Sequence, residues 1–200
     1  MNILLVCGPQ GSGNHLWSKV LSTWADGHPA HKYWVGHKHE PHSSLWENVD
    51  SWNDHSFPDV NTVISVSIPF AVNGNTRFPD IKRWKEIMTE RGLPHEIAVI
   101  TRDKSINYYQ NERVRPVNNY INSIQYINEL DIDAFFSTET LILYKQKYLD
   151  QLNKQLEFPI ECSESRLQNI LGQSFNEKYV KYVHDFPLDL EVRSVSGYAD

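Results

Sequence analysis

The sequence predicts an α/β domain in which a parallel β-sheet is flanked by helices. Residues 2–7 form a short apolar stretch that ends at a glycine, as buried parallel strands do. Two further runs, 62–68 and 96–101, are rich in β-branched and apolar residues. Segments with the 3.6-residue spacing of helices separate these runs. Strands that alternate with helices are typical of a parallel sheet with helices on both faces, a three-layer sandwich.

The first half of the chain contributes two strands and two helices to this prediction. After the strand at 2–7, apolar residues recur with helical spacing over 16–24. Residues 27–60 are rich in His, Trp, Asp and Pro and are expected to be irregular. Pro69 stops the strand at 62–68. A helix over 80–91 has four apolar residues on one face and is closed by Gly92.

The second half repeats the alternation. A third strand over 96–101 is followed by two helices that Pro116 separates, and a short fourth strand leads into a long helix. These later elements are expected at 105–113, 118–130, 134–137 and 141–156. The tail beyond 176 has weak periodicity and receives no assignment. No repeat or linker indicates a second domain, so residues 1–200 are predicted to form one domain.

Composition excludes several classes of protein. Of the 200 residues, 40% are hydrophobic and 22% are charged, which is enough apolar surface for a core. The net charge of −6 disfavours a nucleic-acid partner. Two distant cysteines, Cys7 and Cys162, make neither a disulfide framework nor a zinc ribbon. The short apolar N-terminus has no basic region before it, so we expect a cytoplasmic protein without a membrane partner.

A glycine-rich segment, Gly8–His15, joins the first strand to the first helix, and we call it the glycine loop. Glycines let a backbone turn tightly and bring its N–H groups close to an anion. The following helix directs its positive end at the same point. Ser12, Asn14 and His15 add donors, and Gly11 and Gly13 supply the turn. The sequence therefore predicts a phosphate-binding loop at the carboxyl end of the first strand.

The glycine loop departs from the loop of nucleoside triphosphatases, whose pattern is G-x-x-x-x-G-K-[ST]. Gly8 and Gly13 have this spacing, but Asn14 holds the lysine position and His15 the hydroxyl position. Without these groups, the β- and γ-phosphates lack a cationic partner and Mg²⁺ lacks a protein ligand. The loop is thus equipped to hold a phosphate but not to hydrolyse ATP. The alternative is an ordinary turn whose glycines serve geometry alone.

The glycine loop resembles that of the sulfotransferase family, G-x-P-R-S-G-T-T-L-L, with Gly8, Ser12, Gly13 and Leu16 in matching positions. The resemblance implies a fold like that of P-loop nucleoside triphosphatases and a loop that holds the 5′-phosphosulfate of 3′-phosphoadenosine 5′-phosphosulfate (PAPS). The family's basic residue is replaced by Gly11. We therefore expect His15, Lys19 or a distant residue to supply that charge.

Arg102 follows the third strand and is expected to face the glycine loop. Arginine suits bidentate phosphate recognition, and the alternative is an ion pair with Asp103 or Asp131. The segment resembles the family's second signature, in which Arg and a serine eight residues later hold the 3′-phosphate. Here Gln110 occupies the serine position. The nearest hydroxyl belongs to Ser105, so both enter the predicted nucleotide site.

A third stretch also resembles the family. Sulfotransferases show Tyr-Glu-Asp-Leu after the fourth strand, and this chain has Thr138-Glu139-Thr140-Leu141, a helix, and then Phe158-Pro159. The likeness therefore covers most of residues 2–160, and the order of its motifs carries more weight than any single one.

Three histidines, His37, His39 and His42, lie within six residues. One interpretation is a general base for an acceptor hydroxyl, because imidazole titrates near neutral pH and the family uses a histidine or glutamate this way. A metal site is a second interpretation, although no fourth ligand is evident. A solvated loop is the third. His37 is the first candidate for the base and His39 the second.

Together these features predict a sulfotransferase-like protein that binds PAPS and transfers its sulfonate to a hydroxyl or amine acceptor, a small molecule or a glycan, without a metal. Two alternatives stay open. One is a P-loop nucleotide or nucleoside kinase. The other is a non-catalytic nucleotide-binding relative, an interpretation favoured by Gly11 and Gln110 at the two motif positions.

Overall fold

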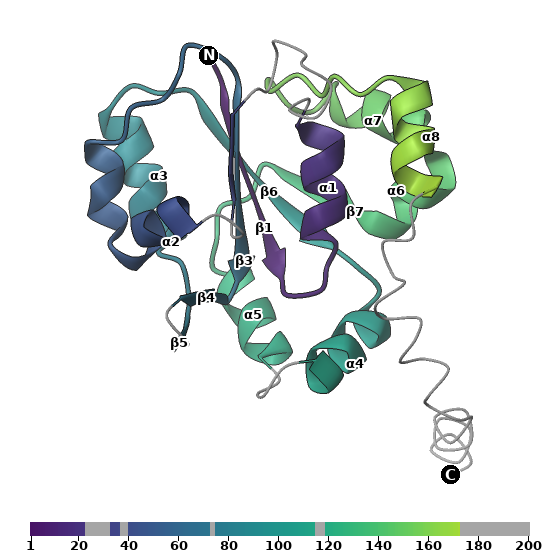
Figure 1. The fold of residues 1–200 in the computed structure, drawn as a ribbon, viewed down its shortest axis with the longest axis horizontal. Coiled ribbons are helices and arrows are strands. Elements are labelled where there is room, and N and C mark those ends of the chain that lie inside the picture. The colour runs from purple at the N-terminus through teal and green to yellow at the C-terminus, as the bar shows by residue number, and fades with distance from the viewer. Residues whose placement is uncertain (23–32, 37–39, 73–74, 115–118, 173–200) are drawn as a thin grey trace.

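A five-stranded parallel sheet forms the centre of the molecule (Figure 1). The computed structural model describes residues 1–22, 33–36, 40–72, 75–114 and 119–172. Its strands are β1 (Ile3–Pro9), β2 (Tyr33–Gly36), β3 (Thr62–Ile68), β6 (His95–Thr101) and β7 (Ala134–Ser137). They lie in the order β2-β3-β1-β6-β7, and each neighbouring pair is parallel. The predicted α/β class with a parallel sheet flanked by helices is confirmed.

Helices cover both faces of the sheet and give it three layers (Figure 1). One layer holds α1 (Asn14–Leu21), α6 (Thr138–Tyr144), α7 (Gln146–Leu152) and α8 (Glu164–Gly172). The opposite layer holds α2 (Glu40–Glu47), the 3₁₀ helix η2 (Val49–Asn53) and α3 (Ile81–Glu90). Toward the carboxyl ends of the strands lie α4 (Lys104–Val114), α5 (Tyr120–Ile127) and a hairpin of β4 (Phe70–Val72) and β5 (Asn75–Arg77).

The alternating side chains of β1 supply the core on both faces. Leu4 and Val6 belong to the cluster that packs against α1 and α8, whereas Leu5 and Cys7 belong to the cluster under α3. All seven residues of β1 are buried, as expected of a central parallel strand. Burial raises the pKa of the Cys7 thiol to about 12, so this cysteine stays protonated and packs as a small apolar residue.

Several elements differ from the expectations. The region expected to be irregular contains β2, which pairs with β3, and also α2 and η2, which attach to the core through Trp46 and Trp52. The indoles of Trp46 and Trp84 lie 6.4 Å apart, so the aromatic residues that looked like loop composition are core residues. The single helix expected at 141–156 breaks at Lys145, whose φ is 48°. Helix α8 was not expected at all.

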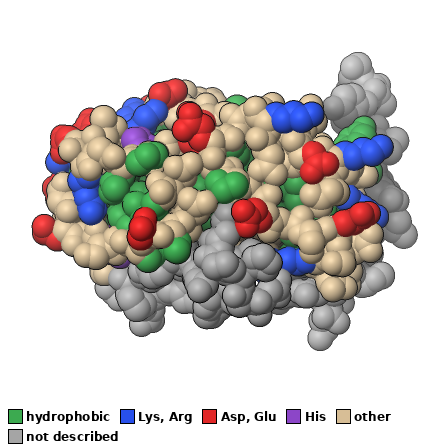
Figure 2. Space-filling view, turned by 90° about the horizontal axis from the view of Figure 1, so that it is seen from above, with side chains coloured by type: hydrophobic (Ala, Val, Ile, Leu, Met, Phe, Trp, Pro, Cys, Tyr) green, Lys and Arg blue, Asp and Glu red, His purple; other side chains and the backbone are tan. Residues whose placement is uncertain are grey.

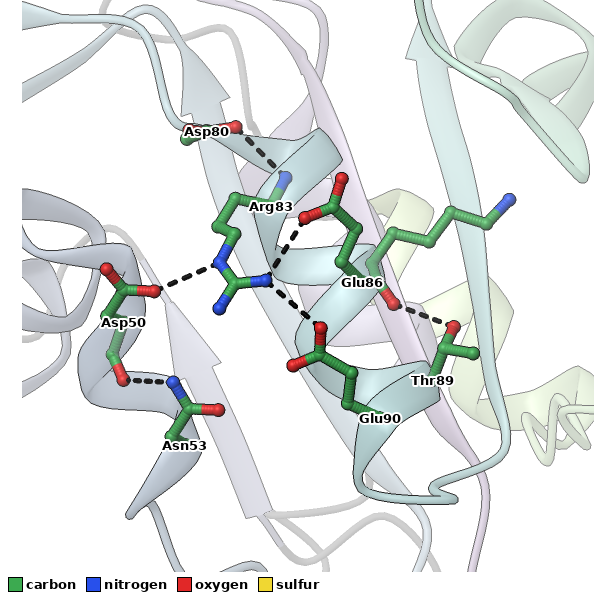
Figure 3. Close-up of polar contacts among 8 residues, drawn as sticks. Asp50, Asn53, Asp80, Arg83, Glu86, Thr89 and Glu90 are labelled. Carbon is green, nitrogen blue, oxygen red and sulfur yellow. Dashed lines mark hydrogen bonds and ion pairs between the residues drawn. The ribbon is translucent and has the colours of Figure 1, made fainter.

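Arg83 of α3 links α3 to η2 by ion pairs on the surface (Figure 3). Its Nε donates to Asp50 of η2 at 3.0 Å, and its Nη1 donates to Glu86 and Glu90 of α3 at 3.1 and 3.3 Å. Asp80 begins α3 by accepting the Arg83 N–H at 3.0 Å. These groups are solvent-screened, so the network orients two surface elements and adds little to the free energy of folding.

The amino-terminal end of the sheet carries a mixed surface. Figure 2 views this end and shows Lys, Arg, Asp and Glu side chains interspersed, with hydrophobic side chains gathered toward the side of α3. No large area of a single charge sign is visible there. None of the helices described is long and apolar enough to cross a bilayer.

The order of the strands fixes where loops meet. From β1 the chain crosses toward β2, and from β6 it crosses toward β7, so the two connections leave neighbouring strands in opposite directions. In open α/β sheets, ligands bind at the carboxyl ends of the strands at such a switch point. The glycine loop and Arg102 follow β1 and β6, so the topology brings these two segments together.

Candidate functional site

The backbone of the glycine loop depends on two glycines with positive φ. Gly11 has φ 85° and Gly13 has φ 115°, values that other residues rarely adopt. The Ser12 N–H donates to Pro9 O at 3.1 Å and closes a turn between them. Gly13 then caps α1 without a side chain, so the first amides of the helix depend on other acceptors.

Three side chains from other elements hold consecutive carbonyl oxygens of the loop. The donors are Asn111 Nδ2 to Gln10 at 2.6 Å, Arg102 Nη1 to Gly11 at 3.0 Å and Thr138 Oγ1 to Ser12 at 2.8 Å. The N–H and C=O of one trans peptide point in opposite directions. The carbonyls face these donors, so the amides of Gly11 and Gly13 face away from them. Backbone amides beside a helix N-terminus are donors of the kind that suit an anion.

The polar side chains of the loop are used within the protein. Ser12 Oγ donates to Asn14 Oδ1 at 3.2 Å, and Asn14 Nδ2 donates to Ser67 Oγ at 2.9 Å. Ser12 is 0% exposed and Asn14 is 6% exposed. Gln10 Nε2 likewise donates to Pro69 O at 2.9 Å. Ser12 and Asn14 were expected as side-chain donors to a ligand, but in the structure both side chains are bonded within the protein.

Two loop glycines lie too close to their neighbours for a side chain. A Cβ at Gly8 would lie 2.7 Å from Ile100 O, and a Cβ at Gly13 would lie 2.7 Å from Thr138 Oγ1. Heavy atoms at that separation overlap, so both contacts require glycine. The glycines that the loop motif places five residues apart therefore press the loop against β6 and α6.

Arg102 lies beside the glycine loop, as its place after β6 suggested. Its Nη1 donates to the Gly11 carbonyl across 91 residues of sequence. The carboxylates considered as alternative partners have other contacts. Asp131 pairs with Lys85 at 2.5 Å, and Asp103 Oδ1 accepts the N–H of Ile106 at 3.0 Å to begin α4. The guanidinium therefore lies beside the loop and is bonded to its Gly11 carbonyl.

The structure describes the other predicted residues to different extents. Ser105 is exposed in the first turn of α4, and Lys19 is exposed in the last turn of α1, away from the loop. The backbones of His15 and Gln110 lie in α1 and α4, but their side chains are outside the description. His37 and His39 lie outside the described residues altogether. Gly11 and Gly13 are in the loop itself.

Several residues of the site were not predicted. Asn111 and Thr138 hold the loop carbonyls, Ser67 at the end of β3 holds Asn14, and Glu139 Oε1 accepts the N–H of Asp103 at 3.0 Å. The Thr138-Glu139 pair was noted as part of a family-like motif, so a signal existed for it. Nothing in the sequence around Asn111 distinguished it from other polar residues of a helix.

One groove lies apart from the glycine loop. A groove of about 520 Å³ lies between α3 and residues 129–131, with Ile81, Ile97 and Leu130 among its lining residues. Two ion pairs join α3 to residues 129–131 there, Lys82–Glu129 and Lys85–Asp131, and the other two acidic lining residues, Glu86 and Glu90, pair with Arg83. Within the described part of the chain, no group of three or more metal-ligating side chains occurs.

Comparison with known proteins adds no family assignment. No protein-family model matches the chain, and no curated protein matches it.

The buried position of Asn14 yields a prediction about the lysine that the loop lacks. We expect Asn14→Lys to lower the free energy of unfolding by about 2–3 kcal/mol, because an ammonium would lose solvent and Ser67 would lose its donor. We also expect no binding of Mg²⁺–ATP. Urea unfolding and nucleotide titration measure the two effects. Lys19→Asn on the exposed end of α1 is the control, and a stable Asn14→Lys variant that binds Mg²⁺–ATP would contradict the prediction.

Proposed function

We propose that this chain is a sulfotransferase-like protein that binds PAPS at the glycine loop and transfers its sulfonate to a hydroxyl or amine acceptor. The observation that carries the proposal is the orientation of the loop peptides. Donors from α4, from Arg102 directly after β6 and from α6 hold the carbonyls of residues 10–12, which turns the amides of Gly11 and Gly13 away from those donors. A phosphosulfate group is an anion of the size that such a loop holds.

Electrostatics favours an anion at this point. The N-terminus of α1 carries roughly half a positive elementary charge. Arg102 adds a full charge behind the Gly11 carbonyl. The transferred sulfonate would then be stabilised by fixed donors as charge develops on it.

The second half of the proposed ligand is assigned by resemblance. Arg102 brings a guanidinium, a group suited to phosphate, and Ser105 presents a hydroxyl in the first turn of α4. We propose that these residues, with Gln110, hold the 3′-phosphate. The proposed catalytic histidines, His15 and His37, rest on sequence alone, His15 as the donor that replaces the missing base and His37 as the general base.

The kinase alternative is less well supported by the geometry. Asn14 occupies the position of the phosphate-binding lysine, and its side chain is bonded to Ser67 rather than directed toward solvent. A non-catalytic nucleotide-binding relative is the second candidate. The observation that favours it is that both Arg102 and Asn14, the groups nearest the loop with strong donors, are engaged with the protein itself.

A thermal-shift comparison tests the proposal. At a hundredfold excess over Kd, a ligand stabilises the folded state by about 2.7 kcal/mol, which raises Tm by roughly 5–10 °C in a chain of this size. We expect this shift with adenosine 3′,5′-bisphosphate and none with adenosine, the phosphate-free control. A larger shift with Mg²⁺–ATP would favour the kinase. Transfer of labelled sulfonate from PAPS to a panel of phenols, sugars and amines then separates the enzyme from the non-catalytic binder.

A further inference from the structure

The glycine loop contains two peptides whose orientation the local sequence does not fix. A peptide flip reverses the directions of its C=O and N–H and changes φ of the residue that follows. Glycine tolerates both signs of φ, so a peptide that precedes glycine flips at low cost. The Gln10–Gly11 and Ser12–Gly13 peptides both precede glycines, whose φ values are 85° and 115°. Local sequence therefore leaves the direction of the Gly11 and Gly13 amides undetermined.

Each of these two peptides is held by one buried side-chain donor from a distant segment. Asn111 Nδ2 donates to Gln10 O, and Thr138 Oγ1 donates to Ser12 O. Asn111 is 2% exposed and Thr138 is 5% exposed, so water does not compete readily for either bond. A flipped peptide would turn its N–H toward a donor, and both hydrogen-bonding groups would be left unsatisfied. That cost selects one orientation.

Both donors are themselves held in place. Asn111 Nδ2 also donates to the carbonyl and side-chain oxygens of Asn107 one turn earlier on α4, each at 3.0 Å. Thr138 Oγ1 accepts from Trp17 Nε1 at 3.3 Å. The Trp17 ring stacks on Phe136 with centroids 4.6 Å apart, inside the core. The Trp17 indole N–H can only donate, so Thr138 Oγ1 accepts from it. The Thr138 hydroxyl proton is therefore donated to Ser12 O.

We propose that Asn111 and Thr138 are positioning residues of the anion site: Asn111 fixes the direction of the Gly11 amide and Thr138 that of the Gly13 amide. Neither is placed to contact the anion, because each lies on the carbonyl side of its peptide. The anion affinity of the loop thus depends on two side chains behind it. The identity of the anion in this inference rests on the proposed function. The peptide orientations do not depend on it.

Binding measurements provide the first test. Thr138→Val keeps the shape of the side chain and removes its donor, and we expect it to weaken adenosine 3′,5′-bisphosphate by about three- to tenfold, the value of one hydrogen bond. Thr138→Ser restores the hydroxyl and should return the affinity to within about twofold of wild type. Because the valine variant also leaves Trp17 Nε1 without its acceptor, it loses stability. Ile87→Val in the core under α3 is the control for stability loss alone, and its affinity should be unchanged.

Amide NMR of the ligand-free protein provides the second test and needs no ligand. We expect Thr138→Val to shift or broaden the Gly13 amide resonance while that of Gly11 stays in place. Asn111→Leu should produce the reverse pattern, and Ile87→Val should leave both unchanged. Unaltered glycine amides in both variants would overturn the inference. Wild-type protein that binds no adenosine 3′,5′-bisphosphate, yet shows this crossed pattern, would overturn the proposed function and leave the positioning roles standing.

Discussion

Gly13→Val is expected to abolish binding of adenosine 3′,5′-bisphosphate and to lower the stability of the fold. At φ 115°, a β-branched residue is strained, and its Cβ would lie 2.7 Å from Thr138 Oγ1. Relief of that overlap moves Thr138 away from Ser12 O or moves the start of α1. Either change displaces the Gly13 amide, so we expect affinity to fall by more than about a hundredfold, the loss of several hydrogen bonds. Isothermal titration calorimetry measures the affinity, and urea unfolding measures the stability.

Gly92→Ala is the matched control for Gly13→Val. Gly92 also has positive φ, 63°, but a Cβ there meets no atom within 4 Å. This variant should lose about 1–2 kcal/mol of stability from backbone strain alone and keep its affinity for the nucleotide. If Gly13→Val bound adenosine 3′,5′-bisphosphate as tightly as wild type, the glycine loop would be excluded as the site.

Arg102→Ala is expected to weaken adenosine 3′,5′-bisphosphate by about 1.5–3 kcal/mol, the value of a charge-assisted hydrogen bond. Two causes contribute. The variant removes the donor to Gly11 O, which supports the loop, and it removes the guanidinium proposed to hold the 3′-phosphate. Adenosine 5′-monophosphate lacks the 3′-phosphate, so it should lose only the first contribution, about 0.5–1 kcal/mol.

The comparison of the two nucleotides separates these roles. Titration of both ligands against wild type and Arg102→Ala gives the excess loss that belongs to the 3′-phosphate. Lys104→Ala removes a neighbouring exposed charge of the same sign and serves as the control for general electrostatics. Equal losses of affinity for both nucleotides would mean that Arg102 only supports the Gly11 carbonyl. The 3′-phosphate would then need another partner.

Local sequence was a good guide to the regular elements. Strands β3 and β7 have the expected bounds, and β1 and β6 differ from theirs by one or two residues, because each is an apolar or β-branched run with a clear stop. The prediction of an irregular region at 27–60 was wrong, because the Trp and His residues in this segment resemble the composition of a loop. Trp46 and Trp52 belong to a core cluster that includes residues of α3, β3 and β6, and no short window of sequence contains these partners.

The sequence by itself determined that a loop with freely turning glycines follows the first strand and that an arginine follows the third expected strand. Tertiary structure alone decided which way the loop peptides point. The donors Asn111 and Thr138 lie 101 and 126 residues from the carbonyls they hold, and the packing of α4 and α6 sets their directions. Contact with Ser67 of β3 likewise holds Asn14 inward, and Asn14 in turn accepts from Ser12. Glycine leaves the backbone undecided, so the direction of its amides is fixed by contacts between segments that are remote in sequence.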